Sequence, residues 1–162
     1  MSENLVTVGI ADCNVIKNTG KLVTYALGSC VGICLYDANT KVAGLAHIML
    51  PDSKALANNT QTRKFADTCI LELVQMMEKN GARRMFMKAK IAGGAQMFAV
   101  KVNSEIANIG KRNIDAVKRT LGELSIPIIA EDVGLNYGRT QYFDAETGEM
   151  TIKSGLKGTK IF

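Results

Sequence analysis

The chain has 162 residues, 47% of them hydrophobic and 22% charged, which suffices for one domain with a sizeable core, expected to span residues 1–162. No stretch approaches the roughly 18 apolar residues of a membrane span. The start, Met1-Ser2-Glu3-Asn4, lacks the features of a signal peptide, so a cytoplasmic protein without membrane insertion is expected. The net charge is +5, but the basic residues are scattered without interleaved aromatics, which favours a solvated surface over nucleic-acid binding and leaves an acidic protein partner open.

The first half of the chain has the composition of β-strands. Residues 5–10 and 22–27 are rich in β-branched and apolar side chains, and the turn-forming residues 17–20 lie between them, so the two runs are expected to be neighbouring strands. Residues 31–36 and 42–50 flank the turn-forming segment Asp37-Ala38-Asn39-Thr40. This pattern predicts a β-hairpin.

The second half alternates between helical and strand patterns. Apolar residues recur every three to four positions over 62–79 and again over 110–123, which predicts two amphipathic helices, the first ending at Asn80-Gly81. Strands are expected at 85–91, 126–130, 140–143 and 150–153. The order is roughly βββββ, α, β, α, βββ. Consecutive hairpins exclude a purely parallel sheet, so we predict an α+β fold, a layered α/β sandwich of mostly antiparallel or mixed strands with two main helices.

The cysteines and the single histidine limit the chemistry that is available. Cys13, Cys30, Cys34 and Cys69 form no CxxC pair, so neither a zinc cluster nor another metal or cofactor is expected, and all four are expected to be thiols. Cys34 within a strand and Cys69 on the apolar face of a helix have the pattern of core residues. Any reaction that needs an imidazole must use His47.

The predicted hairpin brings a cysteine towards this histidine. If the loop is centred on Ala38-Asn39, Cys30 lies directly opposite His47, and Gly32 lies opposite Leu45. Such a pair is close enough for a thiol and an imidazole to share a proton. A three-residue loop or a bulge would instead place His47 opposite Val31.

The residues before Cys30 suit a nucleophile. Gly28 and Ser29 precede it at the start of a strand, where a backbone with little side-chain cover can present N–H groups to a developing oxyanion. Gly28 and Ser29 are therefore the candidate oxyanion or substrate residues. If His47 activates Cys30, the two titrate as a coupled pair, and the low-pH limb of activity lies below the ~8.5 of a free thiol.

Six motifs cover nearly the whole chain: LVTYALGSCVGICLYD at 22–37, GLAHIMLP at 44–51, KIAGGAQMF at 90–98, IGKRN at 109–113, EDVG at 131–134 and NYGR at 136–139. Together they resemble the chemoreceptor glutamine deamidases, the CheD family of bacterial and archaeal chemotaxis. One position departs from the family pattern, because Leu135 stands where a second glycine usually follows Gly134. The departure concerns the conformation of that loop and not the catalytic pair.

The resemblance implies a catalytic triad of Thr24, Cys30 and His47. It also implies a substrate, glutamine side chains of chemoreceptor cytoplasmic domains, which are hydrolysed to glutamate through a thioester on the cysteine; glutamate methyl esters could react through the same acyl-enzyme. Thr24 would hold the imidazole through its hydroxyl or its backbone carbonyl, and Ser29 is the local competitor for that role. From the sequence pattern alone, Thr24 is simply a strand residue.

A second function of a different class stays open. The resemblance also implies binding to a CheC-type phosphatase of the chemotaxis response regulator, so the chain could act as a regulatory partner with an unused site. Met97 and Phe98 after the two glycines at 93–94 are the candidate partner-binding residues, Phe98 more than Met97. The alternative is that both side chains are buried in the core at a bend.

Overall fold

The computed structural model describes residues 4–55, 60–97 and 108–162 and has ten strands and two α-helices in this part of the chain. The elements are β1 (Leu5–Thr7), β2 (Asp12–Lys17), β3 (Lys21–Leu27), β4 (Val31–Asp37), β5 (Val42–Ile48), α1 (Ala66–Lys79), β6 (Met87–Gly93), α2 (Ile109–Glu123), β7 (Ile128–Val133), β8 (Arg139–Asp144), β9 (Met150–Ser154) and β10 (Gly158–Ile161), with short 3-10 turns at Ser53–Ala55, Thr62–Lys64 and Arg84–Phe86.

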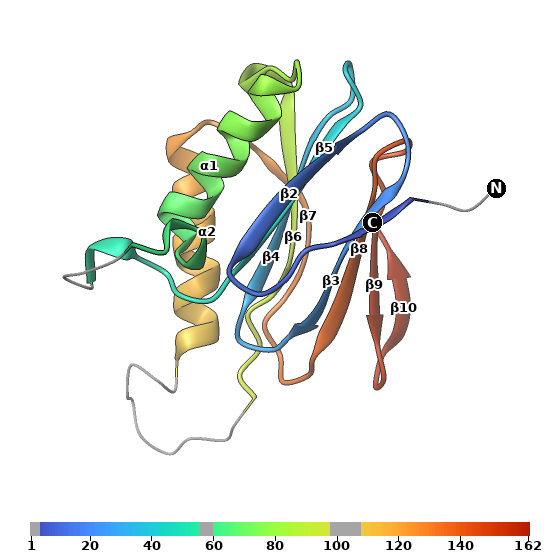
Figure 1. Cartoon of the computed structure of the whole chain (residues 1–162). Helices are drawn as coiled ribbons and strands as arrows, with labels where there is room; N and C mark the ends of the chain where they lie inside the picture. Colours follow the sequence, from blue (N-terminus) through green and yellow to red (C-terminus); the bar gives the residue numbers. More distant parts are fainter. Residues whose placement is uncertain (1–3, 56–59, 98–107) are drawn as a thin grey trace.

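The strands form two five-stranded sheets, ordered β1-β3-β8-β9-β10 and β2-β5-β4-β6-β7. Most neighbours are antiparallel, whereas β1 pairs with β3 and β6 with β7 in parallel. Figure 1 shows α1 and α2 against one face of the β2-β5-β4-β6-β7 sheet and the other sheet against its opposite face. The predicted α+β sandwich with two main helices is therefore confirmed. No helix among the described residues is long and apolar enough to cross a membrane.

Two apolar cores separate the three layers. One lies between the helices and the sheet, where α1 buries one stripe of its surface, from Cys69 and Ile70 through Leu73 to Met77. The other lies between the two sheets and includes Leu22, Leu27, Cys34, Ala43, Leu45 and Phe143. Because strand residues alternate between two faces, alternate residues of β4 and β5 point into this inter-sheet layer.

Two edge strands were not predicted, and the predicted helix start was too early. β2 and β10 each lie at the edge of a sheet. Both strands contain polar residues, and every residue of β10 is exposed, so neither has the apolar pattern that identifies a strand. The predicted strand 5–10 ends at Thr7, because the chain turns at Ala11 (φ 58°) to enter the second sheet. The predicted helix 62–79 begins only at Ala66, because Phe65 has extended backbone and forms a bridge with Leu50.

The hairpin of β4 and β5 is confirmed, but its predicted register is wrong. Gly32, not Cys30, pairs with His47, and Cys34 pairs with Leu45. The reason is the loop: Asp37 pairs with Val42, so the turn occupies residues 38–41 with Lys41 at φ 55° and is centred one residue later than expected. The shift is two residues, which keeps each side chain on its predicted face of the sheet.

Candidate functional site

Thr24 and His47 meet in the layer between the two sheets. Thr24 lies on β3 and His47 on β5, both fully buried, and Thr24 Oγ1 is 2.6 Å from His47 Nδ1. The Thr24 hydroxyl also donates its proton to Val8 O at 2.7 Å. Since a hydroxyl has only one proton to donate, Thr24 Oγ1 must accept from His47, which fixes the proton of the neutral ring on Nδ1.

The other ring nitrogen of His47 is therefore a lone-pair acceptor. Nε2 is buried and has no hydrogen-bond partner among the residues that the structure describes. Burial lowers the pKa of His47 to about 4, because the charged imidazolium is poorly solvated there. At neutral pH the ring is uncharged, held by Thr24 at one nitrogen and able to take a proton at the other, which is the state that a general base requires.

This lowered pKa predicts how stability depends on pH. His47 titrates at about 4 in the folded protein and at about 6.5 in the unfolded chain. Between these values the unfolded state binds more protons, so stability is complete above pH 6.5 and falls as the pH decreases towards 4. We expect the free energy of unfolding in urea to fall by roughly 2 kcal/mol from pH 7 to pH 5.

The control for this measurement is His47→Ala, because the chain has no other histidine. Its free energy of unfolding should change little between pH 7 and pH 5.5, above the range in which carboxylates titrate. The same slope in the variant and the wild type would contradict the burial of a neutral His47.

Cys30 lies immediately before β4, half-buried against the inter-sheet core, with a free thiol. It is two residues from Gly32, the backbone partner of His47, so it is a diagonal neighbour of the histidine at the end of the strand. Within the described part of the chain, the thiol forms no hydrogen bond to the imidazole. Burial raises the pKa of the Cys30 thiol, so the free protein does not hold a preformed thiolate.

The space opposite His47 is filled from the other sheet. A Cβ on Gly32 would lie 1.7 Å from Gln141 Oε1, so only glycine leaves room for this amide. Gln141 is fully buried on β8, pairs with Thr24, and donates through Nε2 to Gly32 O at 3.2 Å. Gln141 and Thr24 thus approach the hairpin from one sheet, and His47 faces them from the other.

A bulge in β3 shapes this side of the site. Thr24 pairs with Gln141 but Leu27 pairs with Arg139, so β3 contains one extra residue between them, and Ala26 has φ 60°. The extra residue reverses the alternation, which turns both Thr24 and Leu27 inward. Tyr25 between them is 47% exposed, at the surface beside the site.

The carbonyls of the segment Gly28–Cys30 are all bound. Gly28 O accepts from Ala95 N at 2.9 Å, and Cys30 O accepts from Gly94 N at 2.8 Å. Gly93 and Gly94 have positive φ values, and a Cβ on Gly93 would lie 2.2 Å from Cys30 O, so the glycines allow this approach. The N–H groups of Ser29 and Cys30, in contrast, donate to no other residue in the described ranges.

Of the two candidate partner-binding residues, only Met97 can be placed. Its side chain is 45% exposed and packs on Gly28, where a Cβ would lie 3.3 Å from Met97 Cγ. Phe98 lies outside the described residues. The loop that includes Leu135 lies nearby, since Leu135 O accepts from Gln96 N at 2.9 Å.

Leu135 keeps the backbone conformation that a glycine would favour. Gly134 and Leu135 have φ values of 79° and 60°, and the Leu135 side chain is 63% exposed. A left-handed conformation costs a non-glycine residue about 1–2 kcal/mol. Leu135 therefore differs from the family pattern in its side chain, but its backbone keeps the left-handed conformation that glycine favours.

Burial, and not register, separates Cys30 from the other cysteines: Cys34 is also two residues from Gly32, and Cys13 pairs with Ala46 beside His47, but both are buried whereas Cys30 is half-buried. Cys34 and Cys69 are fully buried core residues, as predicted, and burial raises the pKa of Cys34 well above its usual value. Cys13 on β2 is also buried. In the described ranges, no three His, Cys, Asp or Glu side chains gather where they could bind a metal ion.

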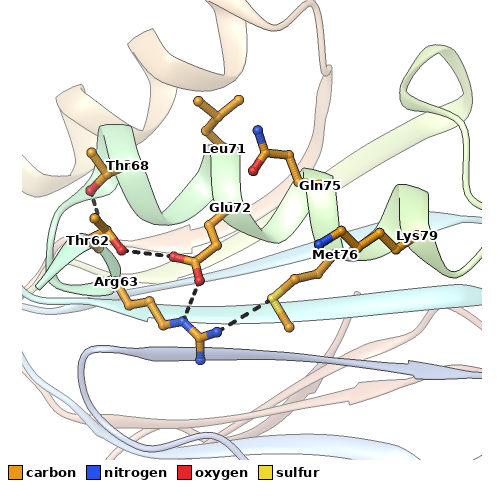
Figure 2. A pocket seen from close by; sticks show the side chains of 8 residues that line it. All are labelled: Thr62, Arg63, Thr68, Leu71, Glu72, Gln75, Met76 and Lys79. Atoms are coloured by element: carbon orange, nitrogen blue, oxygen red, sulfur yellow. Dashed lines mark hydrogen bonds and ion pairs between the residues drawn. The ribbon is translucent and has the colours of Figure 1, made fainter.

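A surface hollow of about 550 Å³ lies away from these residues, on the outer side of α1 (Figure 2). Arg63 crosses its floor and pairs with Glu72 at 2.9 Å, and its guanidinium also contacts Asp12 at 2.6 Å. These ion pairs are partly exposed, so each adds little to stability. None of the candidate catalytic residues lines this hollow.

Two buried polar residues near the site, Gln141 and Asn113, were not predicted from the sequence. Asn113 is fully buried on α2, and its Nδ2 donates to Ser29 O and Met49 O, each at 2.9 Å. The available signal was a polar residue on the buried face of an otherwise apolar helix stripe, together with Ala116 and Val117.

Known proteins are similar to this chain over nearly its whole length. Residues 49–154 match the family model described as CheD chemotactic sensory transduction. The chain is 52% identical to a probable chemoreceptor glutamine deamidase CheD of Lachnoclostridium phytofermentans, covering 96% of this chain and 97% of the relative. Proteins with the same name from Caldanaerobacter subterraneus and Clostridium botulinum are 51% and 54% identical, covering 99% and 96% of each chain. A solved structure, the Bacillus licheniformis hypothetical protein YfiH, gives a remote likeness with a TM-score of 0.42 at 14% identity, over 72% of this chain and 47% of the other.

Proposed function

Because the chain belongs to the CheD family, we propose that it is a chemoreceptor glutamine deamidase, with Cys30 as nucleophile, His47 as general base and Thr24 as the residue that orients His47. The observation that carries the mechanism is the neutral His47: its Nδ1 proton is held by Thr24, and its buried Nε2 has no partner in the described part of the chain. An imidazole held in this tautomer is ready to accept the proton of a thiol.

The first half of the reaction forms a thioester. His47 Nε2 takes the Cys30 proton as the sulfur attacks the carbon of the glutamine carboxamide, because burial raises the pKa of the thiol and the thiolate is not formed in advance. The N–H groups of Ser29 and Cys30, which donate to no other residue in the described ranges, stabilise the oxyanion. His47 then gives its proton to the leaving nitrogen, and ammonia departs.

The second half releases the product. A water molecule loses a proton to His47 Nε2 and attacks the thioester, which yields glutamate and restores the Cys30 thiol. A glutamate methyl ester would form the same thioester with methanol as the leaving group. Thr24 holds the imidazolium through a neutral hydroxyl and not a carboxylate, so it stabilises the charge less than an aspartate would, and a modest rate follows.

The proposal is tested with a receptor cytoplasmic fragment as substrate. Incubation with the protein should release ammonia in proportion to the glutamines at the modified positions, and a fragment with glutamate at these positions should release none. Equal ammonia from both fragments would contradict side-chain deamidation at those positions.

We also propose that a CheC-type phosphatase docks on the rim of this site, at Met97. Support comes from Met97, which is exposed and packs on Gly28 beside the nucleophile segment, so a partner that contacts Met97 would cover Cys30 and compete with the receptor. A flexible apolar side chain of this kind suits a contact surface.

Met97→Glu should weaken binding to the phosphatase at least about 30-fold, because an apolar anchor commonly contributes ~2 kcal/mol or more. Titration calorimetry measures the affinity, and Met85→Glu is the control, since Met85 is 74% exposed just before β6, away from Gly28. Unchanged affinity in a folded Met97→Glu protein would place the partner elsewhere.

A further inference from the structure

Asn113 connects the two segments that carry the nucleophile and the base. Its amide nitrogen donates to the carbonyl of Ser29, next to Cys30, and to that of Met49, two residues after His47. Both hydrogen bonds measure 2.9 Å, and the side chain is fully buried. One amide group on α2 therefore holds both segments at a fixed separation.

The Ser29 carbonyl is the middle one of three consecutive carbonyls, and the other two are bound by backbone N–H groups. Ala95 N binds Gly28 O, and Gly94 N binds Cys30 O. Each of these backbone donors is already used, so the carbonyl between them depends on a side chain. Asn113 supplies the missing donor.

The position of α2 is fixed by close backbone contact. A Cβ on Gly110 would lie 2.5 Å from Ala95 O and 2.6 Å from Gly94 O, so only glycine allows the helix to approach this closely. Asn113 is one turn further along the same helix. The close contact of Gly110 with Gly94 and Ala95 therefore also brings the Asn113 side chain within hydrogen-bond distance of Ser29 O.

The direction of a carbonyl determines the direction of the next N–H. In a planar trans peptide unit, the C=O of one residue and the N–H of the following residue point in opposite directions. Ser29 O points to Asn113, so the N–H of Cys30 points away from α2. It meets no acceptor on another residue in the described ranges, so it is left to act on the Cys30 side of the peptide unit.

We propose that Asn113 is a positioning residue of the deamidase: by holding the Ser29–Cys30 peptide unit, it aims the Cys30 N–H at the nucleophilic sulfur and at the oxyanion that forms there. This inference rests on the proposed function and adds a residue that touches neither substrate nor the reacting atoms. Burial raises the pKa of the Cys30 thiol, and the N–H of Cys30 acts in the opposite direction, in agreement with this geometry.

The test compares Asn113→Asp with the wild type. The substitution keeps the size of the side chain but removes the two N–H donors. Among the described residues, Asn113 Oδ1 has no partner that could hold a carboxylate in its place. We expect kcat on the receptor fragment to fall about 10- to 100-fold with KM changed less than about 2-fold, because the stabilisation of the oxyanion is lost and substrate binding is not.

A second readout needs no receptor. The rate of Cys30 alkylation by iodoacetamide, followed by peptide mass spectrometry across pH 7–11, should have a midpoint higher by about half a pH unit or more in the variant. Ala116→Gly is the matched control: it weakens α2 one turn further on but touches neither carbonyl, and it should leave the midpoint unchanged. If wild-type protein does not deamidate the fragment, the proposed function fails, whereas the alkylation midpoint still decides the role of Asn113.

Wild-type midpoint and wild-type kcat in a folded Asn113→Asp protein would overturn the inference, and so would an equal shift in Ala116→Gly. If Asn113→Asp does not fold, Asn113→Ala, which adds no charge, is used in the same two measurements. A third measurement uses the wild type alone: the amide proton of Cys30 should exchange faster than those of Gly94 and Ala95, which are hydrogen-bonded. Equal protection of the three amides would contradict the assigned direction of the Cys30 N–H.

Discussion

Cys30→Ala is expected to lower the rate of receptor deamidation by about 10⁴-fold or more, because no other group in the proposed site can form the thioester. The fold should persist, since Cys30 is only half-buried at the end of a strand. Ammonia release and circular dichroism on the same samples measure the two effects.

The other thiols provide matched controls for this substitution. Cys34→Ala and Cys69→Ala should each retain turnover, at a cost of about 1–2 kcal/mol in unfolding free energy for the small cavity left in the core. Activity in Cys30→Ala comparable to that of the wild type would exclude a Cys30 nucleophile. Complete loss of activity in Cys34→Ala with an intact fold would point to the wrong cysteine.

His47→Ala is expected to cost about 10³- to 10⁴-fold at neutral pH, because burial raises the pKa of the Cys30 thiol and the attack needs a base. The loss should not add to that of Cys30→Ala in the double variant, since the two side chains act in one proton-transfer step. A loss that adds in full would mean that His47 serves another role.

The pH dependence of the deamidation rate tests the role of His47 as a base most directly. In the wild type, activity should persist down to about pH 5, because His47 with its lowered pKa of about 4 stays neutral there. In His47→Ala, activity should rise with pH through the range above 8.5, where hydroxide generates the thiolate. Identical pH profiles for wild type and His47→Ala would contradict the role of His47 as the base.

Thr24→Val is a milder change at the same site. It keeps the base but removes the acceptor for the Nδ1 proton, and it should lower the rate of deamidation about 10- to 100-fold.

The fold was predictable wherever one short segment carries its own pattern. The buried stripe of α1 and the turn between β4 and β5 are visible in the sequence because burial on one face imposes a period and because Asp and Asn favour turns. β2 was not predictable, because this edge strand has polar residues, among them Asn14 and Lys17. The hairpin register failed by two residues because it depends on the number of loop residues, which composition does not determine.

The site was predictable in its reacting groups but not in their supports. Cys30 and His47 follow from a search for a thiol and the only imidazole, and the register error preserved their common face because it was an even number of residues. Thr24 and Asn113 act on partners in distant segments, Val8 O and Ser29 O, which lie 16 and 84 residues away in the chain. No local pattern encodes such contacts, so only the resemblance indicated the role of Thr24, and the role of Asn113 was not predicted.

The central claim is that Cys30 converts a receptor glutamine to glutamate through a thioester. The most direct measurement is peptide mass spectrometry of a receptor cytoplasmic fragment after incubation with the wild-type protein and, separately, with Cys30→Ala. The account predicts a gain of ~1 Da at specific glutamines with the wild type and at none with Cys30→Ala, since the amide nitrogen is replaced by oxygen only after attack by the thiol. The same gain with both proteins, or no gain with the folded wild type, would contradict it.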